Sequence, residues 1–475
     1  MKKEVRLEFL LVTMILAATP GWSAPGDNRL SGQWPQWRGP EGRGLSRETG
    51  FATEWSAAKN IKWKTEIPGS GHSSPVVWGD HIFLTTSIKG EPVPGGREAP
   101  VHLDFSHNPG YLHPDAVGID SFHRVETLAI HAKTGKILWK QMSYEGLMSD
   151  DHHKSNNYAS STVVTDGKLV YAFFESLGLY AYDFKGKLKW KSSVGDVIKA
   201  GLGPGTSPIL FEKLIILQCD QEMGKGSFIT ALDKTTGKPV WRAERKNRRS
   251  WATPLLVKAG DRYELVTAGA ESVTAYDPAT GKELWKANGT ESHPIPSPVA
   301  APNLVILTAG SQAKRALAIR TGGTGDLTNS DAVVWRHDKG TAYVASPVVH
   351  GDYLYLVSDA GIFTCLNAAT GEVVYEGGRV PLPARIRASL VAFEDKLLVT
   401  SDEGASFVIR AGPKFEVLAT NSLEESVWAS PALSRGTIFI RGAKHLFAIQ
   451  APANSGADLG PALAVTQDGR KETGQ

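Results

Sequence analysis

Two signals repeat along the 475-residue sequence and predict an all-β protein, an eight-bladed β-propeller of four-stranded blades. One signal is a turn motif followed by an aromatic residue. The other is a pair of small residues that opens a run of β-branched and aromatic residues. Beyond the N-terminal segment, no stretch has the three-to-four spacing of apolar residues that marks an amphipathic helix. The 49 glycines suit many tight turns, and the 13 tryptophans suit aromatic packing between blades.

The small-residue pairs occur eight times, once in each predicted blade. They are Ser74-Pro75, Ser161-Thr162, Ser207-Pro208, Thr253-Pro254, Ser297-Pro298, Ser346-Pro347, Ser389-Leu390 and Ser430-Pro431. The turn motifs end at Trp139, Trp190, Trp241, Trp285 and Tyr375, with a longer variant at Trp335 and a degenerate one at Leu418. We assign these aromatic residues to packing against the neighbouring blade, because a buried indole ring covers a large area.

The two ends of the repeat region predict how the ring closes. The last unit, which opens at Ser430, contains only three strand-like runs, whereas the segment around Trp63 has an aromatic strand with no strands ahead of it. Pairing of the Trp63 strand with the last blade leaves no free sheet edge. The expected organisation is an arm over residues 24–60, a propeller over 61–450 with an insertion at about 88–123 in the first blade, and a disordered tail over 451–475.

The N-terminus predicts export. Lys2, Lys3 and Arg6 precede the apolar run of residues 9–18, which is too short to span a membrane and is followed by small residues. We therefore expect a signal peptide over residues 1–23 and a periplasmic or extracellular protein. No cysteine lies near the cleavage point, so a lipoprotein anchor is not expected, and neither is a transmembrane anchor in the mature chain.

The charge and the cysteine content limit which partners and which disulfide bonds are expected. The chain has 52 Lys and Arg against 49 Asp and Glu, and a net charge of +3 is too small to indicate nucleic acid as a partner. Cys219 and Cys365 are the two cysteines. Export would permit a disulfide, but the two residues lie in apolar contexts in different repeats, so we expect two buried free thiols.

The turn motif resembles the docking motif of the PQQ-type (pyrroloquinoline quinone) β-propeller repeat family. Residues 231–241 and 275–285 match it in full: Ala, any residue, Asp, two residues, Thr-Gly-Lys, two residues, Trp. The resemblance covers residues 63–450, and the segments WPQWRGPEGRG and PGSGHSSPVVWGD resemble those of secreted members. It implies kinship with quinoprotein alcohol dehydrogenases, which bind the quinone and Ca²⁺ in the central funnel, and with a non-catalytic lipoprotein of the outer-membrane assembly machinery. This chain lacks both the adjacent cysteines of many such dehydrogenases and the lipoprotein cysteine.

Residues just before the small-residue pairs are expected to line one mouth of the central channel. These candidates are His72, Tyr158, Gly205, Trp251, Ile295, Tyr343, Arg387 and Trp428. Aromatic rings with an imidazole and a guanidinium group suit a planar or anionic ligand, although such residues also plug the narrow end of propellers. Asp220 and Arg245 are further ligand-binding candidates, because they are expected to face each other across neighbouring blades. A solvated loop salt bridge is the alternative.

Histidine and aspartate gather in and after the insertion of the first blade. The candidate metal ligands are His102, Asp104, His107, His113, His152 and His153, with Asp115, Asp120, Asp150 and Asp151 nearby. Three or four such residues bind zinc or a similar ion when they converge. The spacing matches no known metal motif, and long insertions also act as lids or partner surfaces.

The sequence contains no nucleophile motif, phosphate-binding loop or nucleic-acid module. We therefore expect a non-catalytic propeller that binds a small molecule or a protein partner at the channel mouth, without a cofactor. The alternative is a dehydrogenase that depends on PQQ and Ca²⁺ and oxidises an alcohol or sugar.

Overall fold

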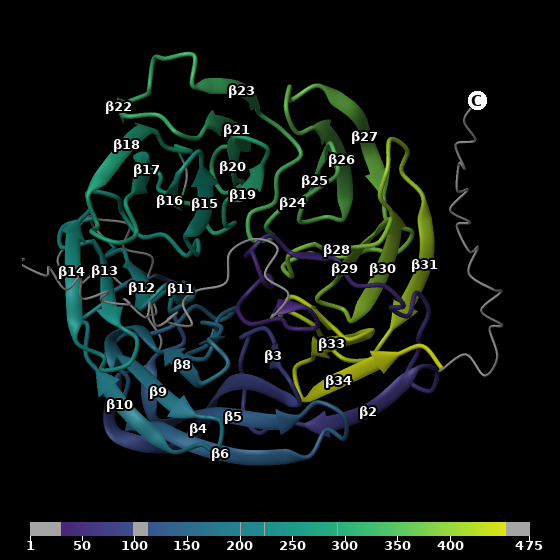
Figure 1. Ribbon diagram of the computed structural model, residues 1–475. Coiled ribbons are helices and arrows are strands. Elements are labelled where there is room, and N and C mark those ends of the chain that lie inside the picture. Colours follow the sequence, from purple (N-terminus) through teal and green to yellow (C-terminus); the bar gives the residue numbers. More distant parts are fainter. Residues whose placement is uncertain (1–29, 98–112, 200, 223, 292, 453–475) are drawn as a thin grey trace, which may run out of the picture.

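The computed structural model describes residues 30–97, 113–199, 201–222, 224–291 and 293–452. In these ranges the chain forms eight β-sheets arranged in a ring (Figure 1), with the 3-10 helix η2 (Glu175–Leu177) in a connection. Each sheet contains the four antiparallel strands of one blade, and two of the sheets have a short extra strand. The predicted eight-bladed, all-β propeller is confirmed.

Blades 1 to 4 follow the chain in order. Blade 1 is β3 (Val76–Trp78), β4 (His81–Arg97), β5 (Ile119–His131) and β6 (Ile137–Gly146); blade 2 is β7 (Val164–Thr165), β8 (Leu169–Phe173), β9 (Leu179–Asp183) and β10 (Leu188–Ser192); blade 3 is β11 (Ile209–Phe211), β12 (Leu214–Cys219), β13 (Phe228–Asp233) and β14 (Pro239–Glu244); blade 4 is β15 (Leu255–Ala259), β16 (Arg262–Thr267), β17 (Ser272–Tyr276) and β18 (Glu283–Asn288), with β22 (Gly325–Asp326) added in parallel.

Blades 5 to 8 complete the ring. Blade 5 is β19 (Val299–Ala301), β20 (Leu304–Ala309), β21 (Arg315–Arg320) and β23 (Val333–His337); blade 6 is β24 (Val348–His350), β25 (Tyr353–Val357), β26 (Ile362–Asn367) and β27 (Val373–Arg379); blade 7 is β28 (Val391–Phe393), β29 (Lys396–Thr400), β30 (Ala405–Arg410) and β31 (Val417–Ser422), with β1 (Leu45–Ser46) beside β28; blade 8 is β32 (Ala432–Ser434), β33 (Thr437–Arg441), β34 (His445–Gln450) and β2 (Ile61–Glu66).

The N-terminal strand closes the ring as predicted. β2 lies antiparallel to β34, with Ile61 opposite Ile449 and Glu66 opposite His445. Figure 1 shows the purple strand β2 beside the yellow strand β34. The outer edge of the last blade is therefore formed by a segment that precedes all the other blades in the sequence.

A circle of eight hydrogen bonds joins the inner strands. In each blade a backbone N–H at the start of the inner strand donates to a Ser or Thr hydroxyl of the next blade, over 2.8 to 3.1 Å. The residues are Ser74, Thr162, Ser207, Thr253, Ser297, Ser346, Ser389 and Ser430. The repeated small residues of the sequence are therefore the groups that set the spacing of the blades around the channel.

The aromatic residues dock onto the turn of the next blade. The indole N–H groups of Trp63, Trp139, Trp190, Trp241 and Trp335 donate to backbone carbonyls of the following blade, over 2.9 to 3.2 Å. The turn glycine lies against the ring: at Gly237, with φ of +72°, a Cβ atom would lie 2.4 Å from Trp190. Trp285 differs, because its indole donates instead to the buried carboxylate of Glu264.

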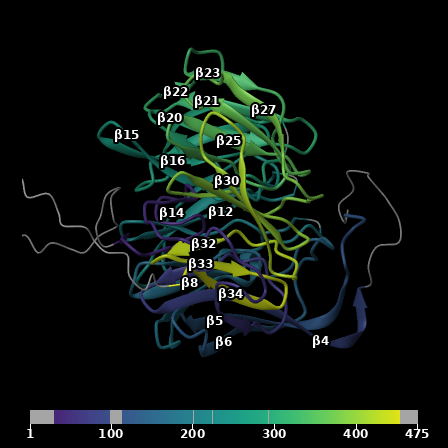
Figure 2. The same ribbon diagram turned by 90° about the vertical axis from the view of Figure 1, so that its right-hand side faces the viewer.

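An N-terminal arm crosses the centre of the ring (Figure 1). Trp34 exchanges two backbone hydrogen bonds with Val77 of blade 1, and β1 pairs in parallel with β28 of blade 7. Blade 1 has by far the longest strands, and the far part of β4 stands beyond the body of the ring (Figure 2). The predicted signal peptide lies outside the described residues, as does the predicted tail from residue 453 onward. Cys219 and Cys365 are both buried and free, as predicted.

Candidate functional site

A cavity of about 420 Å³ opens where the inner strands begin, on the channel axis. We call it the mouth cavity. It is lined by Trp37, His72, Ser74, His113, His153, Ser155, Asn156, Ser160, Thr162, Leu202, Pro204, Gly205, Ser207, Trp251, Thr253, Ile295, Tyr343, Val344, Arg387, Ser389, Trp428 and Ser430. Seven of the eight predicted mouth residues are in this set, Tyr158 being the exception. The volume lies within the range of small-molecule sites.

Tyr158 is buried and packs between the rings of His123 and His152, with centroids 4.7 and 4.6 Å away. The predicted mouth residue of blade 2 was therefore two positions too early in the sequence. The hydroxyl of the circle comes from Thr162 rather than Ser161, and most predicted mouth residues stand two positions before their hydroxyl residue. In blade 2 that position is Ser160, which lines the cavity.

Trp428 forms one wall with two groups against its ring. The His72 ring lies 4.4 Å from the Trp428 ring, and the Arg387 guanidinium carbon lies 4.6 Å from it. Burial, reinforced by Arg441 and Arg387, lowers the pKa of His72 to about 3, so its imidazole is neutral at physiological pH. The wall therefore offers an aromatic surface with one adjacent cation.

Arg387 also forms an ion pair at the rim. Its Nη1 atom lies 2.5 Å from Oδ2 of Asp402, which is largely buried. Burial raises the pKa of Asp402 to about 6, although Arg387 opposes the shift. The charge of Arg387 is thus partly neutralised by a carboxylate that gains a proton in mildly acidic solution.

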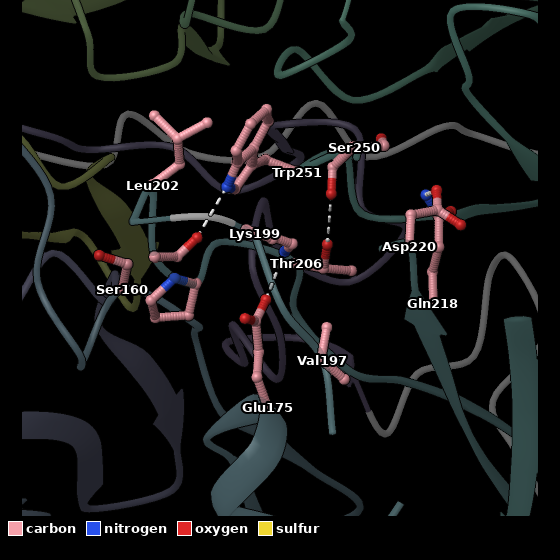
Figure 3. Close-up of polar contacts among 12 residues, drawn as sticks. Ser160, Glu175, Val197, Lys199, Leu202, Thr206, Gln218, Asp220, Ser250 and Trp251 are labelled. Carbon is pink, nitrogen blue, oxygen red and sulfur yellow. Dashed lines mark hydrogen bonds and ion pairs between the residues drawn. The ribbon is translucent and has the colours of Figure 1, made fainter. Parts of the chain in front are cut away.

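Trp251 forms the opposite wall, held by buried polar groups (Figure 3). Its indole N–H donates to the Gly203 carbonyl over 2.8 Å. Behind the ring, the Lys199 ammonium lies 5.5 Å from the ring centroid and donates to Glu175 over 2.5 Å. Both charged side chains are buried, and burial raises the pKa of Glu175 against the effect of Lys199. This pair was not predicted from the sequence, because Glu175 in η2 and Lys199 are 24 residues apart and belong to no repeated motif.

Asp220 and Arg245 pair as predicted but not at the mouth. Arg245 Nε lies 2.7 Å from Asp220 Oδ1, and both side chains are completely buried. Arg245 also donates to Thr267 and Tyr276 of blade 4. The pair therefore joins blades 3 and 4, and neither residue lines the mouth cavity. The prediction that this pair anchors a ligand at the mouth is therefore wrong, and so is the alternative of a solvated loop salt bridge.

Of the predicted metal ligands, His113 and His153 converge with Asp115. One ligand atom from each of the three lies within 4.8 Å of the others. His152 does not join them, because its Nδ1 atom contacts the His153 carbonyl and its ring packs on Tyr158. His102, Asp104 and His107 lie outside the described residues.

The cavity does not fit the calcium ion of the quinoprotein dehydrogenases. Ca²⁺ takes six to eight oxygen ligands, usually with several carboxylates. Among the described residues, none that lines the mouth cavity is Asp or Glu. The two tryptophan rings could stack on a planar quinone, but the oxygen-rich shell beside it is missing.

A second cavity of about 370 Å³ lies between the arm and blades 3 to 5. Trp37 lines both cavities, so the arm separates them within the channel. Trp37 was not predicted to line the channel, although it lies in the segment WPQWRGPEGRG that carried part of the resemblance.

Solved structures with the same fold include BamB and two alcohol-oxidising dehydrogenases. BamB from Moraxella catarrhalis is 15% identical, with 71% of this chain and 90% of that chain covered and a TM-score of 0.51. Quinohemoprotein alcohol dehydrogenase from Comamonas testosteroni is 12% identical, with 92% and 83% covered and a TM-score of 0.58. A europium-containing methanol dehydrogenase is 11% identical, with 87% and 90% covered and a TM-score of 0.58. At these identities the likeness shows the fold alone.

No curated protein sequence matches the chain. In the described part of the chain, no helix has the length and apolar character needed to cross a membrane. A family model described as "Outer membrane protein assembly factor BamB" matches residues 39–198, 224–325 and 325–411, which is most of the chain. Together with the repeat motifs and the eight-bladed ring, this match shows that the chain belongs to the PQQ-type β-propeller family that the model describes.

Proposed function

We propose that this protein is an exported, non-catalytic propeller that binds a ligand in the mouth cavity. The ligand is a small molecule or a short segment of a partner protein. The observation that carries the proposal is the pairing of two tryptophan walls, Trp251 and Trp428, with the cation of Arg387 around one cavity of ligand size. The family description, an assembly factor, favours a binding role over a catalytic one.

The rest of the lining suits recognition. Six hydroxyl groups of the circle face the cavity, and each accepts a backbone N–H while keeping its own proton for donation. Flat rings with hydroxyl donors suit a ligand that has a planar or sugar ring and polar substituents.

Two measurements on the full chain test the proposal. Native mass spectrometry detects a retained small molecule, and a photo-reactive amino acid at Tyr343 captures a partner segment. Tyr343 is 43% exposed on the cavity wall, and Val240, 53% exposed on the outer strand β14, is the control position. Trp428→Ala should weaken binding by about 2 kcal/mol or more, the scale of a buried aromatic anchor. Equal binding by the wild type and by Trp428→Ala and Trp251→Ala variants would exclude the cavity as the site.

The dehydrogenase alternative is tested separately by reconstitution with PQQ and Ca²⁺. The fold and the tryptophan walls favour it, and the absence of a carboxylate from the described cavity lining opposes it. We expect no dye-linked alcohol or sugar oxidation, and calcium-dependent turnover would replace the binding proposal.

A further inference from the structure

We propose that His113, Asp115 and His153 bind a divalent transition-metal ion, such as Zn²⁺, at the rim of the mouth cavity. The two segments that carry them are held together by backbone contacts. Ala116 forms a β-bridge with His153, and the Lys154 amide donates to the Asp115 carbonyl over 2.8 Å. The three side chains are therefore placed by paired backbone rather than by separate loops.

The spacing of the ligand atoms suits one metal ion. His153 Nε2 lies 3.3 Å from Asp115 Oδ2. Two ligands bound at 2.0 to 2.1 Å to a tetrahedral ion are about 3.3 to 3.4 Å apart. Lys154 holds the other oxygen of Asp115, Oδ1, over 2.8 Å and leaves Oδ2 for the metal. At the largest separation permitted in the cluster, 4.8 Å, two ligand atoms must approach each other by about 1.5 Å to reach this spacing.

Hydrogen bonds fix the ring nitrogens before the metal binds. The Nδ1 atoms of His113 and His153 accept backbone N–H groups of Asp115 and Ser155, over 3.1 and 3.0 Å. In the neutral rings Nε2 therefore carries the proton, and metal binding at Nε2 requires the proton to move to Nδ1, which breaks the hydrogen bond from the backbone N–H. For His153 the Ser155 hydroxyl, 2.7 Å from Nδ1, can accept it. In the described residues the contact at Nδ1 of His113 is the Asp115 amide, which is a donor, so we expect weaker binding than at a closed structural zinc site.

The site is of the open type. Three protein ligands leave at least one coordination position free, as in zinc sites that bind water or a ligand. His113 and His153 both line the mouth cavity, so the free position adjoins it. An oxygen donor on a cavity ligand, such as a carboxylate, would complete the shell. The site goes beyond the proposed function, because metal binding does not require that ligand.

The test is titration of chelator-treated, full-length protein with Zn²⁺ by calorimetry and with Co²⁺ by visible absorption. We expect one ion per chain. Asp115→Asn and His153→Ala should each lower the affinity by about 100-fold or more, because loss of a ligand costs at least as much as loss of its hydrogen-bond partner. The matched control is His445→Ala: His445 contacts Glu425 over 2.6 Å, and no third ligand joins this pair in the described residues. That variant should bind Zn²⁺ as the wild type does.

Circular dichroism melting checks that each variant is folded. Asp115 is 41% exposed, so Asp115→Asn decides the question if His153→Ala does not fold. Binding that is equally tight in the wild type and in Asp115→Asn, or weakened only by His445→Ala, would overturn the site. If no ligand is found in the mouth cavity but Trp428→Ala still binds Zn²⁺, the proposed function is refuted and the metal site is retained.

Discussion

The backbone amide of Ser430 donates to the hydroxyl of Ser74 over 3.1 Å, although 356 residues separate them in the sequence. This contact completes the circle of eight hydrogen bonds around the channel. Both side chains are buried where they border the mouth cavity, so the contact is largely shielded from bulk water. The ring is thus closed twice, at its inner rim by Ser74 and at its outer edge by β2.

Ser74→Ala leaves the Ser430 amide without its acceptor. We expect a loss of about 1 to 3 kcal/mol in the free energy of unfolding, the cost of an unsatisfied buried donor. Ser193→Ala is the control, because that exposed hydroxyl accepts only the nearby Gly195 amide and its loss should change stability by about 0.5 kcal/mol or less. Denaturant unfolding measures both, and equal stabilities would contradict the role of the circle.

Deletion of residues 24–66 removes β2 and leaves β34 as an open edge. We expect misfolding or aggregation, because an unpaired strand recruits other chains. Light scattering and thermal melting of the purified fragment measure this. A truncated protein that melts like the full chain would refute closure by β2.

Lys199→Met leaves Glu175 buried without its cation. We expect a loss of about 3 to 5 kcal/mol at neutral pH. Burial already raises the pKa of Glu175, so the folded state binds a proton more tightly than the unfolded state. Stability of the variant should therefore increase as the pH falls toward the ordinary carboxyl range. The double variant Lys199→Met with Glu175→Leu should recover stability and lose that pH dependence, and melting curves across pH check both.

Asp402 should make stability depend on pH in the same direction. Its pKa is about 6 in the folded protein, above the ordinary value of 3.8, so ionisation opposes folding. Compared with Asp402→Asn, the wild type should lose stability as the pH rises from about 4 to 6, with a constant difference above that range. Parallel thermal melts measure the difference. A difference that does not change with pH would show that Asp402 ionises normally.

Cys219 and Cys365 should not react in the native protein. Burial raises the pKa of the Cys219 thiol well above its usual range and that of Cys365 to about 12, so neither forms the reactive thiolate. Ellman's reagent should detect no thiol before unfolding and both thiols afterwards, without reductant. Detection of none after unfolding would show that the two are linked.

Repetition made the fold predictable. Each blade carries the same small residue and, in most blades, the same turn and aromatic residue, so strand order and ring closure could be read from spacing. The mouth residues could also be predicted, because most of them lie two positions before the hydroxyl residue of their blade. Tyr158 was predicted wrongly because Ser161 and Thr162 both carry a hydroxyl, and the structure uses that of Thr162. Contacts outside the repeated motifs, such as that of Lys199 with Glu175, could not be predicted, because the other blades have no equivalent residue pair in their sequence.

The pairing of β2 with β34 also sets a minimum time for folding in the cell. The two strands are separated by residues 67 to 444. At about 5 to 20 residues per second, synthesis of that stretch takes roughly 20 to 75 s. During this period β2 lacks its partner β34. The last blade can form only after nearly all of the chain has been made, so β2 presents an unpaired edge until the C-terminal residues arrive.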